Sequence, residues 1–145
     1  MNEAVEETTH SSETTATMPV VQVDEETDLY VLYTVLGTAH PEEGVYELDM
    51  KASPRLIAAL AGEMAQQKRA IILDMRLITF ADSAGFAALT QIHRSVRERL
   101  GQPLYLIGLS EPVQRVCRLM RLETIMRIKS SEFEAVAEIR AAAHR

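Results

Sequence analysis

The sequence predicts one α/β domain: a mixed β-sheet of four to five strands, opened by an N-terminal hairpin, with four α-helices packed mainly on one face. A length of 145 residues suits a single domain. Hydrophobic residues make up 47% and charged residues 25%, which excludes collagen-like and wholly disordered chains. From Ser53 onward, stretches with apolar residues at helical spacing alternate with short apolar runs. This alternation favours a largely parallel sheet with right-handed crossovers.

The start of the chain is polar and acidic. Residues 1–17 are rich in Glu, Thr and Ser, so we expect a disordered acidic leader there and the folded domain over residues 18–145. Residues 1–28 hold eight acidic side chains and no Lys or Arg, whereas residues 84–129 hold eight basic and three acidic ones. This basic excess is suited to steering an acidic protein partner and is too weak to indicate nucleic-acid binding. No signal peptide or membrane-spanning run is found, so we expect a cytoplasmic protein without membrane insertion.

The first elements are extended. Pro19–Val23 and Leu29–Leu36 are rich in β-branched and aromatic residues, and the acidic stretch Asp24–Asp28 between them is typical of a turn. A hairpin is therefore predicted. Gly37–Gly44 is predicted to be a loop, and Val45–Leu48 a short extended segment.

A helix and a buried strand follow. Ser53 is a suitable N-cap and Pro54 a suitable first helical residue, and the helix is expected to end near Gln67. Its apolar stripe consists of Leu56, Ile57, Leu60, Ala61 and Met64. Ala70–Leu73 is a short apolar run that ends in Asp74, as expected of a central strand.

The second helix begins at the dipeptide Asp82-Ser83 and is stopped by Gly101. Its apolar positions are Phe86, Leu89, Ile92, Val96 and Leu100. Leu104–Ile107 is then predicted to be another buried strand.

The last third repeats this order. Ser110 is expected to cap a helix with apolar positions at Val113, Val116, Cys117 and Met120. Ile125–Ile128 is predicted to be the final strand, and Ser131 with Glu134 forms a capping box for a helix ending near Ala143. The residues expected in the core are Leu73, Phe86, Leu89, Leu106, Ile107, Val116 and Met120.

The segment Asp74–Gly85 is the candidate functional region, because functional residues of such sheets follow the carboxyl ends of strands. Ser83 is predicted at the start of a helix, where free N–H groups and the positive end of the helix dipole meet. The simplest interpretation of Asp82 or Ser83 is a helix cap. The chain has a single cysteine, Cys117, which is predicted to be a buried core thiol. No metal site and no cofactor are predicted.

Several segments together resemble the STAS domains of bacterial anti-sigma factor antagonists. The central run ending in Asp74 is separated by seven residues from Asp82-Ser83-Ala84-Gly85, and the two are similar to the family's strand and Asp-Ser-Ser/Thr-Gly motif. Tyr46-Glu47-Leu48-Asp49 and Leu106–Val113 are similar to the flanking segments, although Tyr46 stands where Gly is usual and Ala84 where Ser or Thr often follows. The resemblance covers residues 18–145.

This resemblance implies a non-enzymatic regulator. The unphosphorylated antagonist binds an anti-sigma factor that is also a serine kinase with bound ATP, and this frees a sigma factor. By this resemblance Ser83 is the expected phosphorylation site: its phosphorylation would release the antagonist, and a PP2C-type serine phosphatase would reset it. The expected partner-binding residues are Phe80, Asp82, Ser83, Ala84 and Gly85, with Arg76, Arg94 and Arg97 at the margin. Asp49 and Asp74 are expected to support this surface, and Asp82 to position the Ser83 hydroxyl.

Three alternatives remain. A serine hydrolase would need Gly at Ala81 and a histidine near Ser83, but His93 lies about 15 Å further along the same helix. A phospho-aspartate receiver built on Asp74 and Lys129 would need a carboxylate pair after an early strand. STAS domains also serve as accessory subunits of lipid-transport ABC systems and in stress-signalling scaffolds.

Overall fold

The structure, a computed structural model, describes residues 18–40 and 45–144. The prediction for the acidic leader at residues 1–17, and part of the predicted loop at residues 41–44, lie outside the described residues.

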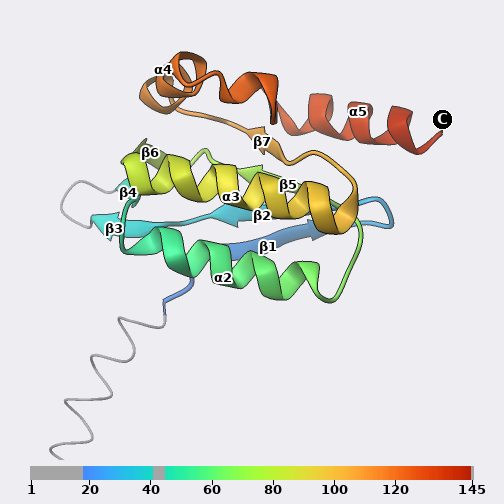
Figure 1. The fold of residues 1–145 in the computed structure, drawn as a ribbon, viewed down its shortest axis with the longest axis horizontal. Helices are drawn as coiled ribbons and strands as arrows, with labels where there is room; N and C mark the ends of the chain where they lie inside the picture. Colours follow the sequence, from blue (N-terminus) through green and yellow to red (C-terminus); the bar gives the residue numbers. More distant parts are fainter. Residues whose placement is uncertain (1–17, 41–44, 145) are drawn as a thin grey trace, which may run out of the picture.

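A five-stranded mixed sheet forms the centre of the molecule (Figure 1). Its strands, in spatial order, are β1 (Val21–Glu26), β2 (Tyr30–Val35), β5 (Ala70–Asp74), β7 (Tyr105–Ile107) and β8 (Arg127–Lys129). Strands β1 and β2 form the antiparallel hairpin, with an irregularity between Val23 and Glu25, and the other pairs are parallel. The predicted sheet, its hairpin and its central strand are confirmed, but the predicted turn Asp24–Asp28 was wrong at residues 24–26, because β1 continues to Glu26. The last strand was placed too early, because a 3₁₀ turn at Leu122–Thr124 precedes it.

A second sheet of three strands was not predicted. It consists of β3 (Thr38–His40), β4 (Val45–Leu48) and β6 (Ile78–Ala81), in the order β3-β4-β6. The predicted loop Gly37–Gly44 was therefore wrong at residues 38–40, and residues 78–81, for which no strand was predicted, also form a strand. Both strands are short and pair only with β4, so their apolar periodicity is too brief to be recognised. These strands gather at the end of the molecule where helices α2 and α3 begin (Figure 1).

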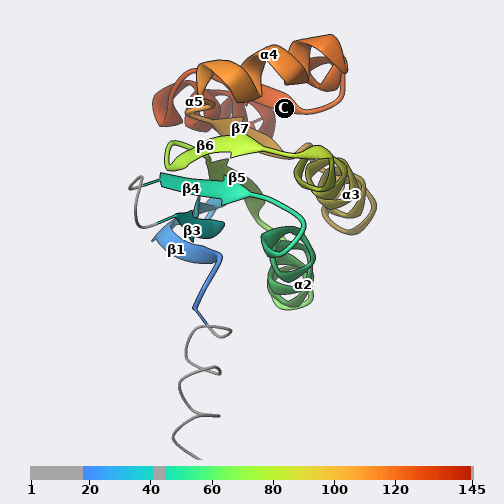
Figure 2. The ribbon, with the colours of Figure 1, turned by 90° about the vertical axis from the view of Figure 1, so that its left-hand side faces the viewer.

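Four helices cover the five-stranded sheet: α2 (Ala52–Met64), α3 (Ser83–Leu100), α4 (Glu111–Leu119) and α5 (Glu132–Ala143). Helices α2 and α3 lie side by side against one face (Figure 2) and share a core with Val113 and Cys117 of α4. Helix α5 packs Ala135 and Ile139 on the opposite face. The expected packing, mainly on one face, is confirmed. The sheet thus has a hydrophobic core on each face. Strand β2 contributes side chains to both cores, because its successive side chains point to opposite faces.

Most helix boundaries follow the predicted signals. Asp82, Ser110 and Ser131 cap α3, α4 and α5 with their side chains, and Gly101 ends α3 in the left-handed conformation at φ +68°. Ser53 was wrongly predicted to cap the first helix. It lies inside the first turn, and its buried hydroxyl makes no hydrogen bond within the described part of the chain. The helix also ends at Met64, three residues before the predicted end.

The predicted core residues are buried with two exceptions. Leu73, Phe86, Leu89, Leu106 and Ile107 are each at most 4% exposed. Val116 is only partly buried against the core, and Met120 is 50% exposed. Met120 was wrongly placed because α4 ends at Leu119, so the helical spacing no longer directs the next side chain inward. Cys117 is buried, as predicted. Burial is the main cause that raises the pKa of its thiol to about 11, and the nearby negative charge of Glu123 is the second cause.

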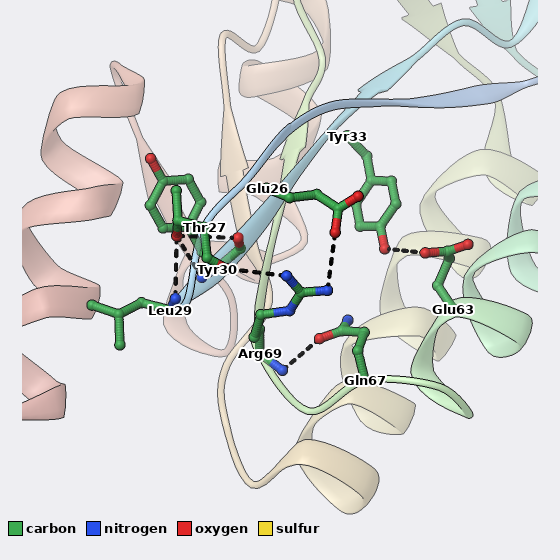
Figure 3. Close-up of polar contacts among 8 residues, drawn as sticks. All are labelled: Glu26, Thr27, Leu29, Tyr30, Tyr33, Glu63, Gln67 and Arg69. Carbon is green, nitrogen blue, oxygen red and sulfur yellow. Dashed lines mark hydrogen bonds and ion pairs between the residues drawn. The ribbon is translucent and has the colours of Figure 1, made fainter.

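Side-chain contacts hold the far end of the hairpin against the loop before β5 (Figure 3). The Arg69 guanidinium donates to the Thr27 carbonyl oxygen at 3.0 Å and pairs with Glu26 at 3.1 Å. The Tyr33 hydroxyl donates to Glu63 of α2 at 2.8 Å. These contacts fix the sheet and α2 relative to each other and leave the opposite end of the molecule for the candidate site.

Candidate functional site

The candidate site lies where β6 leads into α3. Strand β6 ends at Ala81, Asp82 is the N-cap, and Ser83 is the first residue of α3. Ser83 is exposed, whereas Gly85 and Phe86, two and three residues further along the helix, are buried. The serine hydroxyl is therefore presented to solvent beside the free N–H groups at the start of the helix.

Asp82 joins α3 to the loop between β4 and α2. One carboxylate oxygen, Oδ1, accepts the Gly85 N–H at 3.0 Å, and Oδ2 accepts the Met50 N–H at 3.1 Å. The Asp82 N–H in turn donates to the Leu48 carbonyl oxygen at 3.2 Å. Both oxygens therefore bind backbone donors and neither binds the Ser83 hydroxyl, so the hydroxyl is positioned through the backbone.

Gly85 allows close packing at this junction. A Cβ atom added to Gly85 would overlap the Leu48 carbonyl oxygen and lie 3.1 Å from both the Ala81 Cβ and the Leu48 Cγ. Only glycine fits there without displacing backbone. Ala84 is half-buried and carries no hydroxyl, so Ser83 is the hydroxyl-bearing residue of this turn.

Asp49 organises the start of α2, the task that the sequence analysis gave to Ser53. Its Oδ1 atom accepts hydrogen bonds from the Thr38 hydroxyl at 2.7 Å, the Ala52 N–H at 3.0 Å and the Lys51 N–H at 3.1 Å. Burial acts to raise the pKa of Asp49, but these donors outweigh it and hold the pKa below its ordinary value. The loop whose Met50 N–H binds Asp82 is thus held from both sides.

Asp74 and Arg76 form a tight pair at the end of β5. Asp74 is 1% exposed, and its carboxylate accepts the Arg76 N–H at 3.0 Å, Nε at 2.8 Å and Nη2 at 2.7 Å. The Arg76 side chain is nevertheless 70% exposed to solvent. Gly108 lies over the pair, since a Cβ atom there would overlap the Arg76 side chain. Asp74 therefore fixes the turn between β5 and β6.

Exposed apolar side chains occur near Ser83. Phe80 of β6 is 50% exposed and Met50 is 71% exposed. Arg94 is also exposed, on α3 about 16 Å along the helix from Ser83. Met50 was not among the residues predicted for this site. The sequence does carry one indication of an exposed apolar side chain: Met50 stands between the charged residues Asp49 and Lys51, just before a helix begins.

Ser110 contributes a further contact that the sequence analysis did not predict. Besides capping α4, its hydroxyl donates to the Thr79 carbonyl oxygen of β6 at 3.1 Å. The Thr79 hydroxyl donates to the Tyr46 carbonyl oxygen of β4 at 3.2 Å. Strand β6 is thus held from both sides just before it reaches Ser83.

One group of side chains has the composition of a metal site, although none was predicted. A ligand atom of His40, one of Glu47 and one of Asp49 all lie within 4.8 Å of one another. The signal in the sequence was the alternation Glu47-x-Asp49, which places both carboxylates on one face of an extended segment.

Comparison with known proteins identifies the family. The model of the STAS domain matches residues 45–135, and the chain belongs to this family. No curated protein sequence matches the chain. Within the described ranges, no helix combines the length and apolar character needed to cross a membrane.

Solved structures share the fold. TM1081 from Thermotoga maritima, provisionally named an anti-sigma factor antagonist, has a TM-score of 0.69 and 20% identity over 87% of this chain and 97% of its own. The anti-sigma factor antagonist SpoIIAA in its unphosphorylated form has a TM-score of 0.65 and 23% identity over 83% and 96%. The murine anion transporter Slc26a9 matches with a TM-score of 0.65 and 16% identity over 81% of this chain and 18% of the transporter. The chain therefore has the fold found in anti-sigma factor antagonists and in one part of a transporter.

Proposed function

We propose that this protein is an anti-sigma factor antagonist controlled by phosphorylation of Ser83. In its unphosphorylated form it binds an anti-sigma factor that is also a serine kinase, and a sigma factor is freed. The observation that carries the proposal is the exposed Ser83 at the first position of α3, beside an Asp82 whose carboxylate is already satisfied by backbone donors. Structures named as antagonists share the fold, and SpoIIAA has been solved in both an unphosphorylated and a phosphorylated form.

The position of Ser83 suits a switch that acts on binding and leaves the fold intact. A phosphoserine adds about −1.5 to −2 charge. Free N–H groups and the helix dipole at the start of α3 offset this charge inside the protein. At an interface the same charge adds to that of Asp82 and must lose its water on binding. A coupling free energy of only ~3 kcal/mol would weaken the complex more than a hundredfold.

The docking surface that we propose is centred on Ser83 with apolar side chains beside it. Exposed Phe80 and Met50 supply apolar area, Asp82 to Gly85 supply the helix start, and Arg94 supplies positive charge further along α3. Arg76 lies at the margin, with its guanidinium held by Asp74. A partner that places an apolar pocket over Phe80 and an acidic rim near Arg94 would complement this surface.

The remaining components follow from this proposal. ATP is bound by the partner kinase and not by this chain, and a PP2C-type serine phosphatase restores free Ser83. The reaction cycle takes place in the cytoplasm. This chain itself is a substrate and binding partner in the cycle, not an enzyme.

The test uses untagged full-length protein coupled to beads in native cell extract. The wild type and Ser83→Ala should capture a protein that, given Mg-ATP, phosphorylates the wild type once and leaves Ser83→Ala unmodified. Ser83→Asp should capture it poorly, because one added charge partly imitates phosphate. Ser130→Ala, at an exposed serine before α5, is the matched control and should be phosphorylated like the wild type.

Phosphorylation of Ser83→Ala at the wild-type rate would contradict the assignment. Capture of a transport protein, equal for wild type and Ser83→Asp, would instead favour an accessory role in transport, the alternative that the fold of Slc26a9 supports.

A further inference from the structure

The hairpin of β3 and β4 gathers three potential metal ligands on one face. Thr38 pairs with Glu47 and His40 with Val45, so His40 and Glu47 are diagonal neighbours whose side chains point the same way. Asp49 lies two residues beyond Glu47 and reaches the same face, where it accepts the Thr38 hydroxyl. One ligand atom from each of His40, Glu47 and Asp49 lies within 4.8 Å of the other two.

The imidazole of His40 points into this group. Its Nε2 atom lies 3.3 Å from Glu47 Oε1. This nitrogen is shielded from solvent and makes no hydrogen bond within the described residues, although 38% of the side chain is exposed. A ring nitrogen beside two carboxylates is placed either to donate its own N–H to Glu47 or, in the other tautomer, to bind a metal ion that the carboxylates also ligate.

The Asp49 carboxylate is oriented for a further ligand. Its three hydrogen bonds, from Thr38 and from the N–H groups of Lys51 and Ala52, all end on Oδ1. No other residue of the described ranges donates a hydrogen bond to Oδ2, so this oxygen is available to a cation. Hydrogen bonds that hold a ligating carboxylate in place are a regular feature of metal sites.

We propose that His40, Glu47 and Asp49 form a binding site for a divalent transition-metal ion of the zinc type. One imidazole nitrogen and two carboxylate oxygens are suited to Zn²⁺, Co²⁺ or Mn²⁺, whereas Ca²⁺ and Mg²⁺ prefer oxygen ligands alone. Three protein ligands, all of them half-buried, leave the remaining coordination positions to water. A dication also offsets the repulsion between the two carboxylates.

Occupancy of this site would act on the neighbouring switch region. Asp49 is followed by Met50, whose N–H binds Asp82. A metal ion would join β3, β4 and this loop, and it would restrict the loop that holds the start of α3. The site goes beyond the proposed function and does not depend on it.

The test is calorimetric titration of the untagged full chain with ZnCl₂, together with thermal unfolding at each metal concentration. We expect one ion per chain and a rise in the unfolding temperature with ZnCl₂. His40→Gln and Glu47→Gln should each lose at least about tenfold in affinity, as substitutions around metal sites do. His93→Gln is the matched control, because His93 is another half-buried histidine outside the group and its replacement should leave the affinity unchanged.

Two further readouts keep the outcome clear. With Co²⁺ as the probe, the visible absorption of the bound ion should be altered in His40→Gln if the imidazole is a ligand, and circular dichroism of both variants without metal verifies that they fold. Unchanged Zn²⁺ affinity in His40→Gln, or no binding at millimolar ZnCl₂, would overturn the proposal.

Discussion

Gly85 of α3 packs directly against the backbone carbonyl of Leu48 at the end of β4. Any side chain at residue 85 would overlap this oxygen. The contact brings the start of α3 to the loop whose Met50 N–H binds Asp82. The presentation of Ser83 therefore depends on the absence of a side chain two residues further along.

We expect Gly85→Ala to destabilise the protein by at least about 1–3 kcal/mol, because the obstructing atoms include backbone and cannot rotate away. Gly62→Ala is the control. Gly62 lies in α2 with nothing within 4 Å of an added Cβ, so alanine there should stabilise by about 0.5–1 kcal/mol. Urea unfolding measures both. Equal effects of the two substitutions would contradict the close contact at Gly85.

Leu89→Ala and Leu106→Ala should each lower the free energy of unfolding by about 2–5 kcal/mol, since both side chains are 0% exposed and their removal leaves a cavity. Met120→Ala should cost less than about 1 kcal/mol, because Met120 is 50% exposed. Chemical denaturation decides the order. A loss below roughly half a kcal/mol at both leucines would show that the core is assigned wrongly.

Asp82→Asn should slow phosphorylation of Ser83 more than it weakens partner binding. An asparagine oxygen can still accept the Gly85 N–H, so the helix cap is kept, but the amide group cannot also accept the Met50 N–H. The loop is then no longer tied to the start of α3. Phosphate incorporation and binding affinity are measured on the same preparations, and a wild-type rate of phosphorylation would argue against a positioning role.

Arg94→Glu should slow association with an acidic partner and change its salt dependence, with little effect on folding. Arg140→Glu is the matched control, because Arg140 is exposed on α5, which packs on the opposite face of the sheet. Arg76 is less suitable, since its loss would leave the buried Asp74 without a counter-charge. Stopped-flow association at low salt compares the variants. Equal rates for Arg94→Glu and the wild type would remove Arg94 from the interface.

Glu138→Gln should destabilise the protein by about 1 kcal/mol at neutral pH. Glu138 of α5 binds Lys129 at 2.8 Å, Arg127 at 3.1 Å and the Tyr105 hydroxyl at 3.2 Å. Burial acts to raise the pKa of Glu138, but these partners, Lys129 above all, outweigh it and lower the pKa below the ordinary 4.5.

The sign of the pH dependence follows from this lowered pKa. The stabilisation by the ionised carboxylate is present above the unfolded-state value near 4.5 and is lost as the pH falls through the lower folded-state pKa. The difference between wild type and Glu138→Gln should therefore be largest above about pH 5 and shrink in more acidic solution. A difference that stays constant down to pH 3 would show that the charge of Glu138 does not cause it.

The sequence predicted the elements with strong local signals. Helix α3 has a cap at Asp82, six buried residues at helical spacing and a left-handed glycine at its end, and each was recognisable in isolation. Strand β5 is five consecutive buried residues, as a central parallel strand requires.

Other features depend on contacts between distant segments. The cap of α2 was assigned to Ser53, whereas Asp49, before the N-cap residue Lys51, accepts the first N–H groups and is itself hydrogen-bonded by Thr38 of another strand. Strands β3 and β6 are short, and β4 pairs with both. The candidate site was predicted at Asp82 and Ser83 from their motif. The contact of Met50 with Asp82 and the group of His40, Glu47 and Asp49 depend on the second sheet, which brings these residues together.

Strand β1 has a consequence for the behaviour of the protein at high concentration. It is an edge strand of the five-stranded sheet, and such an edge is a template for pairing with another molecule. Asp24, Glu25 and Glu26 are exposed along this strand, and an irregularity in pairing between Val23 and Glu25 interrupts its regular edge. Like charges on two such edges would repel, so the strand resists the sheet-to-sheet aggregation that an apolar edge would invite. Charge repulsion at this edge therefore opposes strand pairing between two copies of the chain, and it should weaken as salt is added.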